Sequence, residues 1–291
     1  MAQIDHFTFG ALTPALAYAM SCAGSLLGLL CTGRARLLSG SGQARWLMFG
    51  ALAIGGTGIW VMHFIAMLGF TINGATIRYD IPLTLLSAVI AVVVVGFGLL
   101  VVGLGRLTVP SLLLSGLITG IGVAAMHYAG MAAMHANIHI GYDITVVGIS
   151  ILIAVGAATA ALWAALRVRG AWATTGAALI MGVAVSSMHY TGMSAMSVDG
   201  SVGAGEPHGA PPLGFLAPLI VGIAVSTICL LTAVAVAPSQ REMQAETELM
   251  NRVRQRQNQP PIWLDTINRP QGQSEHPERP DDGPPGPPGR F

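Results

Sequence analysis

The chain has 291 residues, of which 53% are hydrophobic and only 9% are charged, with a formal net charge of +1. Soluble domains carry roughly a quarter charged residues, so this composition excludes an ordinary soluble enzyme and indicates a protein whose solvent is the lipid bilayer. The near-neutral charge gives no reason to expect a nucleic-acid partner. All 14 basic residues are Arg, and the absence of Lys excludes a retinal protein, whose Schiff base needs a lysine.

Along the chain, seven apolar stretches are long enough to form membrane-spanning helices. They cover residues 9–31, 46–70, 81–104, 111–134, 144–166, 172–196 and 213–236. Each contains 23 to 25 residues and no Asp, Glu, Lys or Arg, and about 20 helical residues cross the hydrocarbon core of a bilayer. We therefore expect an all-α membrane protein whose bundle contains seven transmembrane helices.

The arginines between these stretches predict the orientation of the chain. The connections after the first, third and fifth stretches hold Arg34, Arg36, Arg45, Arg106, Arg167 and Arg169, and no acidic residue. The connections after the second, fourth and sixth stretches hold Arg78 together with Asp80, Asp143, Asp199 and Glu206. Because arginine-rich loops stay in the cytoplasm, we expect a multi-pass protein of the inner (plasma) membrane, with its N-terminus outside and its C-terminus cytoplasmic.

The two ends of the chain differ from this apolar region. The first ten residues lack the basic stretch of a signal peptide, so the first apolar stretch is expected to be a retained helix. We place a seven-transmembrane domain at residues 1–236 and a tail at residues 237–291, with a juxtamembrane helix over 239–258 and a disordered Pro- and Gly-rich segment after Pro260. Such a tail is not expected to fold a catalytic domain. We therefore expect no enzyme activity and a separate, unidentified cytoplasmic signalling partner.

One motif recurs at the ends of the second, fourth and sixth stretches. Its copies are Met62-His63-Phe64-Ile65-Ala66-Met67, Met126-His127-Tyr128-Ala129-Gly130-Met131 and Met188-His189-Tyr190-Thr191-Gly192-Met193. The histidines are 64 and then 62 residues apart, so the expected fold is three two-helix repeats plus a seventh helix. Before the third and fifth stretches stand Tyr79-Asp80 and Tyr142-Asp143, which predict helix N-caps preceded by tyrosines at the membrane interface.

The three histidines share one depth in the membrane. Each lies about seven residues before the outer end of its stretch, or ~10 Å at the helical rise. The methionine four residues later lies on the same helix face, whereas the preceding methionine diverges by about 100°. We expect all three histidines to point into the bundle, where they find partners that lipid does not offer. Because the preceding methionines diverge, two neighbouring sites are favoured over one cluster of three histidines.

Imidazole and thioether groups together form a soft ligand set. Thioether sulfur favours Cu(I) and imidazole also accepts copper, whereas zinc would take thiolate or carboxylate ligands that this depth does not offer. Copper is therefore the predicted metal. The alternative is packing, because a buried histidine can serve as a hydrogen-bonding residue, methionine fills irregular gaps, and duplication can preserve a packing motif.

The repeated Met-His-Tyr-Thr/Ala core, complete in residues 188–191, resembles the MHYT family of bacterial membrane sensor domains over the first six stretches. The resemblance implies a sensor-like domain that binds copper and, through it, a diatomic gas such as O2, CO or NO. The metal ligands that it implies are Met62, His63, Met67, Met126, His127, Met131, Met188, His189 and Met193. The chain departs from the family pattern at Phe64, where the family has Tyr.

Three functions stay open for these residues. The leading one is a metal-binding sensor of a gas or of redox state that acts through a partner. A copper handling or storage protein would use the same ligands without signalling. A haem-bearing electron carrier would use His127 and His189 as axial ligands. Haem iron takes one pair of axial ligands, so a motif present in three equivalent copies fits this function less well.

Overall fold

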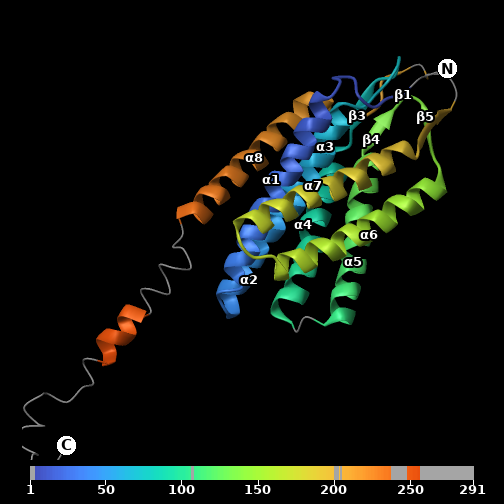
Figure 1. Ribbon diagram of the computed structural model, residues 1–291. Coiled ribbons are helices and arrows are strands. Elements are labelled where there is room, and N and C mark those ends of the chain that lie inside the picture. The colour runs from blue at the N-terminus through green and yellow to red at the C-terminus, as the bar shows by residue number, and fades with distance from the viewer. Residues whose placement is uncertain (1–3, 106–107, 200–202, 204, 237–247, 256–291) are drawn as a thin grey trace, which may run out of the picture. The chain divides into compact units, whose positions relative to one another are not determined.

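Figure 1 shows the computed structural model of the chain, which describes residues 4–105, 108–199, 203, 205–236 and 248–255. The chain forms two units, residues 1–236 and residues 237–291. In the second unit residues 248–255 are helical, and Glu248 and Arg252 form an ion pair of 3.1 Å one helical turn apart. The rest of the helix predicted for 239–258, and the segment after Pro260, lie outside the described residues.

Seven helical spans in the described residues are long and apolar enough to cross a membrane. They are α1 (Leu12–Ala35), a composite span of α2 (Gly40–Ala51), η1 (Leu52–Val61) and α3 (Met62–Leu68), then α4 (Ile81–Leu104), α5 (Val109–Ala132), α6 (Ile144–Arg167), α7 (Ala171–Ser194) and α8 (Pro212–Val236). The predicted all-α membrane bundle of seven helices is confirmed, and each span overlaps its predicted stretch.

The helix ends differ from the prediction at the arginines. The helices extend beyond the predicted stretches, so that α1 includes Arg34, the second span includes Arg45 and α6 ends at Arg167. Arg34 donates to the carbonyl of Val234 at 2.9 Å, and Arg36 donates to two carbonyls at the C-terminus of α6, at 2.6 and 3.0 Å. A long guanidinium side chain can thus satisfy the free carbonyls at helix C-termini. We call this end of the bundle the arginine end.

The second span is not a uniform α-helix. Residues 52–61 form a π-helix, η1, in which every side chain except that of Leu52 is buried. Gly24 of α1 and Gly55 of η1 lie so close to neighbouring backbone that an added Cβ would collide with it, which shows how small residues let membrane helices approach. The composite span is the most buried of the seven. This span is thus covered on more sides than any other, and α3 follows it directly.

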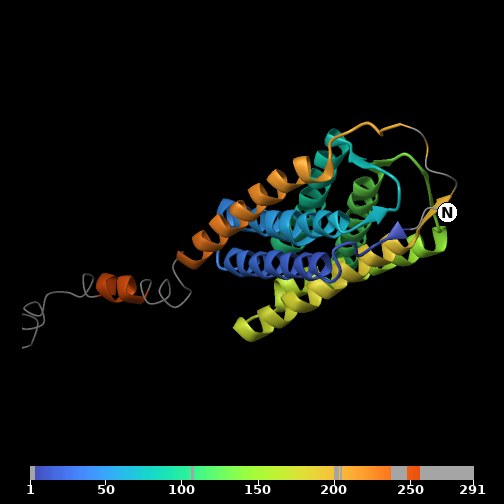
Figure 2. The same ribbon diagram turned by 90° about the horizontal axis from the view of Figure 1, so that it is seen from above.

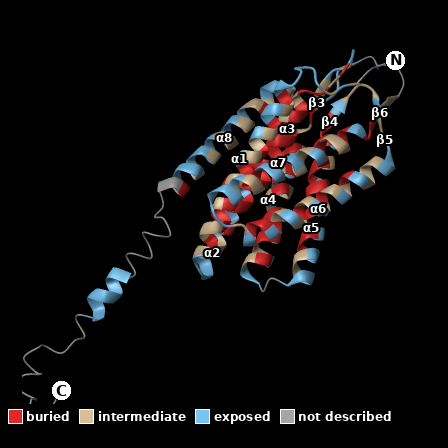
Figure 3. Ribbon diagram, in the orientation of Figure 1, coloured by how far each residue is buried: buried red, intermediate tan, exposed pale blue. Residues whose placement is uncertain are grey.

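The first six spans pack as a ring. α1 contacts η1, η1 contacts α4, the next helices follow in chain order, and α7 returns to contact α1. α8 packs outside this ring against α1 and η1, at the edge of the bundle in Figures 1 and 2. Figure 3 shows buried residues along the helices of the ring, and α8 is the least buried span. The three predicted repeats thus surround one axis, and the seventh helix is an addition.

Three short antiparallel ladders close the other end of the bundle. They pair β1 (Ile4–Asp5) with β2 (Thr71–Ile72), β3 (Ile77–Tyr79) with β4 (Met134–Ala136), and β5 (His139–Tyr142) with β6 (Met196–Asp199). Each ladder joins the segment before the first helix of a repeat to the segment after its second helix. Every repeat is therefore a pair of helices closed by its own hydrogen bonds. We call this end of the bundle the strand end.

The first helices of the second and third repeats begin at the predicted aspartates. The carboxylate of Asp80 accepts a hydrogen bond from the backbone N–H of Leu83 at 2.7 Å. The carboxylate of Asp143 accepts one from the backbone N–H of Thr145 at 2.8 Å. Both are N-caps as predicted, and they fix where α4 and α6 enter the bundle.

The prediction of an interfacial Tyr79 is wrong, whereas Tyr142 is 43% exposed. Tyr79 is 1% exposed and its ring packs against that of Phe64. The connection before α8 runs beside its backbone, and the N–H of Tyr79 donates to the carbonyl of Ala210 at 2.9 Å. This burial raises the pKa of the Tyr79 phenol. Packing against Phe64 in the bundle core thus sets the environment of the Tyr79 ring.

Candidate metal centre

Three buried histidines from the three repeats meet inside the ring. His63 lies in α3, His127 in α5 and His189 in α7, and each is 1% exposed. The Nδ1 atom of His63 lies 3.0 Å from Nδ1 of His189 and 3.1 Å from Nδ1 of His127. One ring nitrogen of each lies within 4.8 Å of those of the other two. The ring planes cross at 78 to 87°, so the rings surround a common point edge to face.

The inward orientation predicted for the histidines is confirmed, and the expectation of two neighbouring sites is wrong. Each histidine is followed by five further residues of its helix. Equivalent positions in three repeats that surround one axis place equivalent side chains at one point. The methionines that precede the histidines point away from them on each helix, but this does not keep the three histidines apart.

Two glycines make room for the imidazole rings. A Cβ added to Gly130 of α5 would collide with Nε2 of His63, and a Cβ added to Gly192 of α7 would collide with Nε2 of His127. Each glycine lies three residues after the histidine of its own repeat and holds the ring of the preceding repeat. The first repeat has Ala66 at this position. The ligand prediction omitted these glycines, although their recurrence at one motif position was the signal that could have found them.

The hydrogen bonding between the histidines favours a shared cation. A neutral imidazole nitrogen carries either one hydrogen or one lone pair, so Nδ1 of His63 can make a strong hydrogen bond to only one of its two neighbours. A metal ion would take lone pairs from all three rings. Metal–nitrogen bonds of about 2.0–2.1 Å place three such nitrogens roughly 3.5 Å apart. The observed 3.0 and 3.1 Å therefore need only a small outward movement.

The chemistry of the donors favours a singly charged ion. Among the described residues the cluster consists of histidines alone and holds no carboxylate or thiolate. Moving an ion from water into a low-dielectric interior costs less for a singly charged ion than for a doubly charged one when all its ligands are neutral. This favours Cu(I) over divalent metals. With Nδ1 bound, the hydrogen is on Nε2, and Nε2 of His63 and His127 has no hydrogen-bond partner in the described part of the chain. Packing against Gly130 and Gly192 thus orients the rings of His63 and His127. In most metal sites a hydrogen-bond acceptor on the second ring nitrogen has this role.

The six candidate methionines are all buried, with exposed fractions of 1 to 3%. Met67, Met126, Met131, Met188 and Met193 belong to the main hydrophobic core. Met62 packs separately, with Ala17 and Ala66. A methionine that binds a metal here and a methionine that only fills the core would both be buried. Metal binding by these sulfur atoms therefore stays a prediction.

The residue after each histidine is aromatic and packs against the histidine ring, with centroid distances of 4.7, 4.9 and 5.0 Å. The hydroxyl of Tyr128 forms a hydrogen bond of 2.6 Å with that of Ser150 in α6. Phe64, which departs from the motif, packs instead on Trp60 at 4.7 Å. The first copy is therefore completed by apolar contacts.

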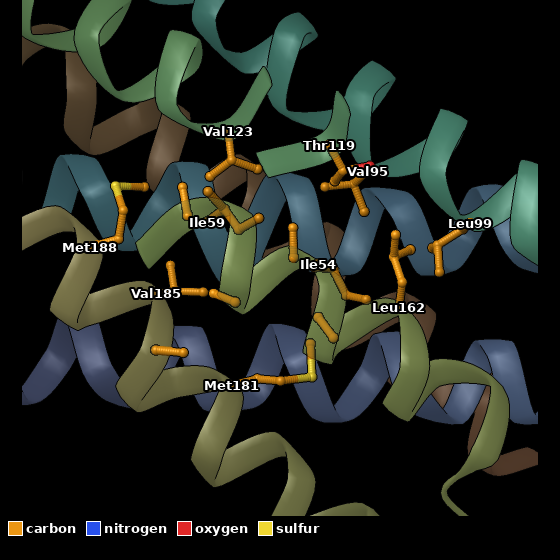
Figure 4. A pocket seen from close by; sticks show the side chains of 15 residues that line it. Ile54, Ile59, Val95, Leu99, Thr119, Val123, Leu162, Met181, Val185 and Met188 are labelled. Carbon is orange, nitrogen blue, oxygen red and sulfur yellow. The ribbon is translucent and has the colours of Figure 1, made fainter. Parts of the chain in front are cut away.

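An apolar cavity of about 50 Å³ lies on the arginine side of the histidines. Figure 4 shows side chains from η1 and from α4 to α7 around it, with Met188 at one end and Leu162 toward the other. Thr119 is the one hydroxyl-bearing residue in its lining. Met188 immediately precedes His189, and no histidine lines the cavity. An apolar cavity of this kind stays dry and can hold small apolar molecules.

Three segments of the chain match the model of the MHYT family, described as a bacterial signalling protein N-terminal repeat. They are residues 56–115, 120–178 and 182–245. Each matched segment contains one of the three histidines. The matches together cover more than half of the chain.

Several curated proteins are similar to this chain. It is 42% identical over 220 residues to the bifunctional diguanylate cyclase/cyclic di-GMP phosphodiesterase MucR of Pseudomonas aeruginosa, which covers 72% of this chain and 31% of that protein. It is 39% identical over 168 residues to the cyclic di-GMP phosphodiesterase NbdA of the same organism, covering 56% of this chain and 21% of that protein. An uncharacterized signaling protein of Caulobacter vibrioides is 34% identical over 247 residues, or 84% of this chain and 29% of that protein. The chain thus spans less than a third of each relative, and no solved structure matches it.

Proposed function

Because the chain belongs to the MHYT family of bacterial signalling repeats, we propose that it is a membrane sensor that binds copper, as Cu(I), between His63, His127 and His189. The observation that carries this proposal is the convergence of ring nitrogens from three repeats on one point. Bound Cu(I) would supply a soft centre able to bind O2, CO or NO. The chain's own residues would hold the ion and exclude water from it.

A diatomic gas is the proposed signal, with redox state as the alternative. O2, CO and NO are small and weakly polar, so they enter apolar cavities without the desolvation cost that polar ligands meet. The cavity lined by Met188 is of this kind, and Met188 is the residue before His189. Its location supports delivery of the gas through the hydrophobic interior rather than from water.

We further propose that the strand end faces outward in the inner membrane and that the C-terminus is cytoplasmic. The distribution of six arginines against one across the two sets of connections supports this orientation. In this proposal the chain is a receptor rather than an enzyme. Because two relatives are named for cyclic di-GMP synthesis or hydrolysis, an enzyme of cyclic di-GMP turnover is the proposed cytoplasmic partner.

The geometry disfavours haem and leaves copper storage as the second candidate. Axial ligands of a haem lie on opposite faces of the macrocycle, whereas the rings of His127 and His189 are in direct contact with centroids 5.1 Å apart. A storage protein would use the same three histidines as the sensor. It would bind copper without any gas-dependent change in the cytoplasmic partner.

The test is copper binding by the purified protein in lipid nanodiscs. We expect about one Cu(I) per chain, which is lost when His63, His127 and His189 are all replaced by Ala. A matched control replaces His135 and His139, which lie outside the cluster, and should retain the metal. A folded triple variant that keeps full copper occupancy would show that the histidines are packing residues.

A further inference from the structure

An open pocket of about 460 Å³ lies at the strand end, between β4, β5 and the connection that leads to α8. Each of these three walls contributes one histidine: His135 in β4, His139 in β5 and His208 in the connection. All three residues are exposed. Of the described histidines outside the buried cluster, only His6 lies elsewhere. The pocket therefore gathers imidazole groups, which are the commonest metal ligands in proteins.

The three walls belong to different parts of the fold. β4 pairs with β3 in the ladder that closes the second repeat, and β5 pairs with β6 in the ladder of the third. The connection that carries His208 leads to α8, the helix outside the ring. Figure 1 shows β4 and β5 together at this end of the bundle. An ion bound by all three imidazoles would thus join two repeats to the connection before α8.

The turn between two of these histidines is fastened to the connection. Asn137 lies between His135 and His139, and its backbone carbonyl accepts a hydrogen bond from the N–H of Gly203 at 2.7 Å. The side-chain amide of Asn137 donates to the carbonyl of Gly203 at 2.9 Å. Its side-chain carbonyl accepts from the N–H of Thr76 at 3.2 Å. The backbone on both sides of the pocket is therefore held in place before any ion binds.

A second set of hydrogen bonds orients the ring of His135. Its Nδ1–H donates to the backbone carbonyl of His208 at 3.2 Å, so in the neutral ring the lone pair is on Nε2. Metal-binding histidines ordinarily donate their other ring N–H in this way. Two residues after His208, Ala210 exchanges two hydrogen bonds of 2.9 Å with Tyr79. His135 is thus held in the tautomer that offers Nε2 to an ion.

The donors in the pocket select a metal cation. Besides the three imidazoles, the residues that line it offer the buried thioether of Met134, and they include no carboxylate, thiolate or guanidinium. Arg78, opposite His135 in the β3–β4 ladder, is paired with Glu206 at 2.7 Å, so its charge is balanced. Imidazole binds transition metals, and among the divalent first-row ions Cu(II) has the highest affinity for such a site.

The imidazole rings must come closer together to share an ion. Among the described residues, the buried cluster alone has three such ligand atoms within 4.8 Å of one another. Exposed side chains change rotamer within picoseconds to nanoseconds, and rings at the surface turn without repacking the core. Because the backbone around Asn137 and Ala210 is already fixed, binding has to order only the side chains.

Contact with water decides the charge of the ion. A doubly charged ion would lose its hydration in the buried cluster, whereas in this open pocket it keeps water molecules as further ligands. The two sites therefore favour ions of different charge. We propose that the pocket is a second metal site, separate from the buried cluster, which binds Cu(II) through His135, His139 and His208.

Cu(II) binding to the full chain in nanodiscs tests the proposal. Metal-free protein is titrated with Cu(II) against a competing chelator, and electron paramagnetic resonance records the nitrogens coupled to the bound ion. We expect one ion coupled to three nitrogens, bound about 100-fold more weakly in the variant His135→Gln/His139→Gln/His208→Gln. These exposed replacements should leave the fold intact. The matched control His6→Gln removes a histidine outside the pocket and should bind as the unmodified chain does.

Cu(I) occupancy of the buried cluster is measured in the same variant and should be retained, so the two sites succeed or fail separately. Equal Cu(II) affinity in the triple variant and the unmodified chain would overturn the proposal. So would coupling to a single nitrogen, or an equal loss in His6→Gln, because the histidines would then bind Cu(II) singly.

Amide exchange tests whether the ion joins the connection to the repeats. The N–H groups of Gly203 and Ala210 donate to Asn137 and Tyr79, and they exchange when the connection opens. Bound Cu(II) should slow exchange at both amides about tenfold in the unmodified chain and leave it unchanged in the triple variant. Unchanged exchange at both amides with Cu(II) bound would show that His208 is not a ligand and would overturn the three-histidine site.

Discussion

The first repeat and the two later repeats reach the same point in the bundle by different means. In the later repeats a histidine stands on a regular α-helix, α5 or α7, and a glycine three residues on holds the ring of the preceding repeat. In the first repeat His63 follows a π-helix, and Ala66 stands in the glycine position. The constant features are the depth and the inward direction of the histidine. This difference indicates that the meeting of the three rings is constrained more strongly than the helix that carries each ring.

Adding one methyl group to the glycines should produce the largest effect. In Gly130→Ala or Gly192→Ala the new Cβ collides with an imidazole, so we expect loss of most bound copper and destabilisation by about 1–3 kcal/mol, as for an overpacked core. The reciprocal change Ala66→Gly should retain copper and cost only about 0.5–1 kcal/mol. Copper content and thermal melting in nanodiscs measure both. Equal retention of copper in all three variants would mean that the glycines do not position the rings.

Replacing the histidines one at a time should weaken Cu(I) binding by different amounts. His63 contacts both of the other rings through Nδ1, so His63→Ala leaves two histidines that share no hydrogen-bonded contact. His127→Ala leaves the pair of His63 and His189 at 3.0 Å. We expect His63→Ala to bind Cu(I) about tenfold more weakly than His127→Ala, or ~1.4 kcal/mol. Competition with a chromogenic Cu(I) chelator gives the affinities, and identical losses would indicate three equivalent ligands.

The smallest effect should be a pH dependence of the ladder of the first repeat. Burial lowers the pKa of His6, although Asp5 opposes this, and the His6 ring packs on Phe70 at 5.5 Å. The folded state therefore favours neutral His6. This contribution to stability is present above the unfolded pKa of about 6.5 and is lost as the pH falls below it.

Amide exchange at the ladders measures this dependence. The β1–β2 ladder has two residue pairs, whereas the β5–β6 ladder has four. On lowering the pH from about 7.5 to about 5.5, exchange at Thr71, corrected for its intrinsic pH dependence, should rise relative to that at Val198. The variant His6→Phe should abolish the relative change. A change that persists in this variant would assign the pH dependence to another group.

The sequence predicted the number, order and approximate ends of the spans because lipid imposes length and apolarity on each of them. It also predicted that the histidines share one depth and face inward, since their recurrence at equal distances from the span ends is local information. It did not predict that the histidines form one cluster, because the position of a residue along its helix gives no information on how three repeats pack around an axis. The π-helix was missed because all its residues except Thr57 are apolar or glycine, so no periodicity distinguishes it. Tyr79 was misplaced because its ring packs on Phe64 of the preceding repeat, a contact that the local sequence does not specify.

The ladders that close each repeat have a consequence for how the protein is made. A helical hairpin whose ends are already joined by hydrogen bonds can leave the insertion machinery as a finished piece, before later hairpins are synthesised. The histidines, in contrast, come one from each hairpin. No single piece, and no two of them, contains the complete triad. The cluster therefore comes into existence only when the third hairpin joins the other two, and a chain that has inserted fewer hairpins holds no complete cluster.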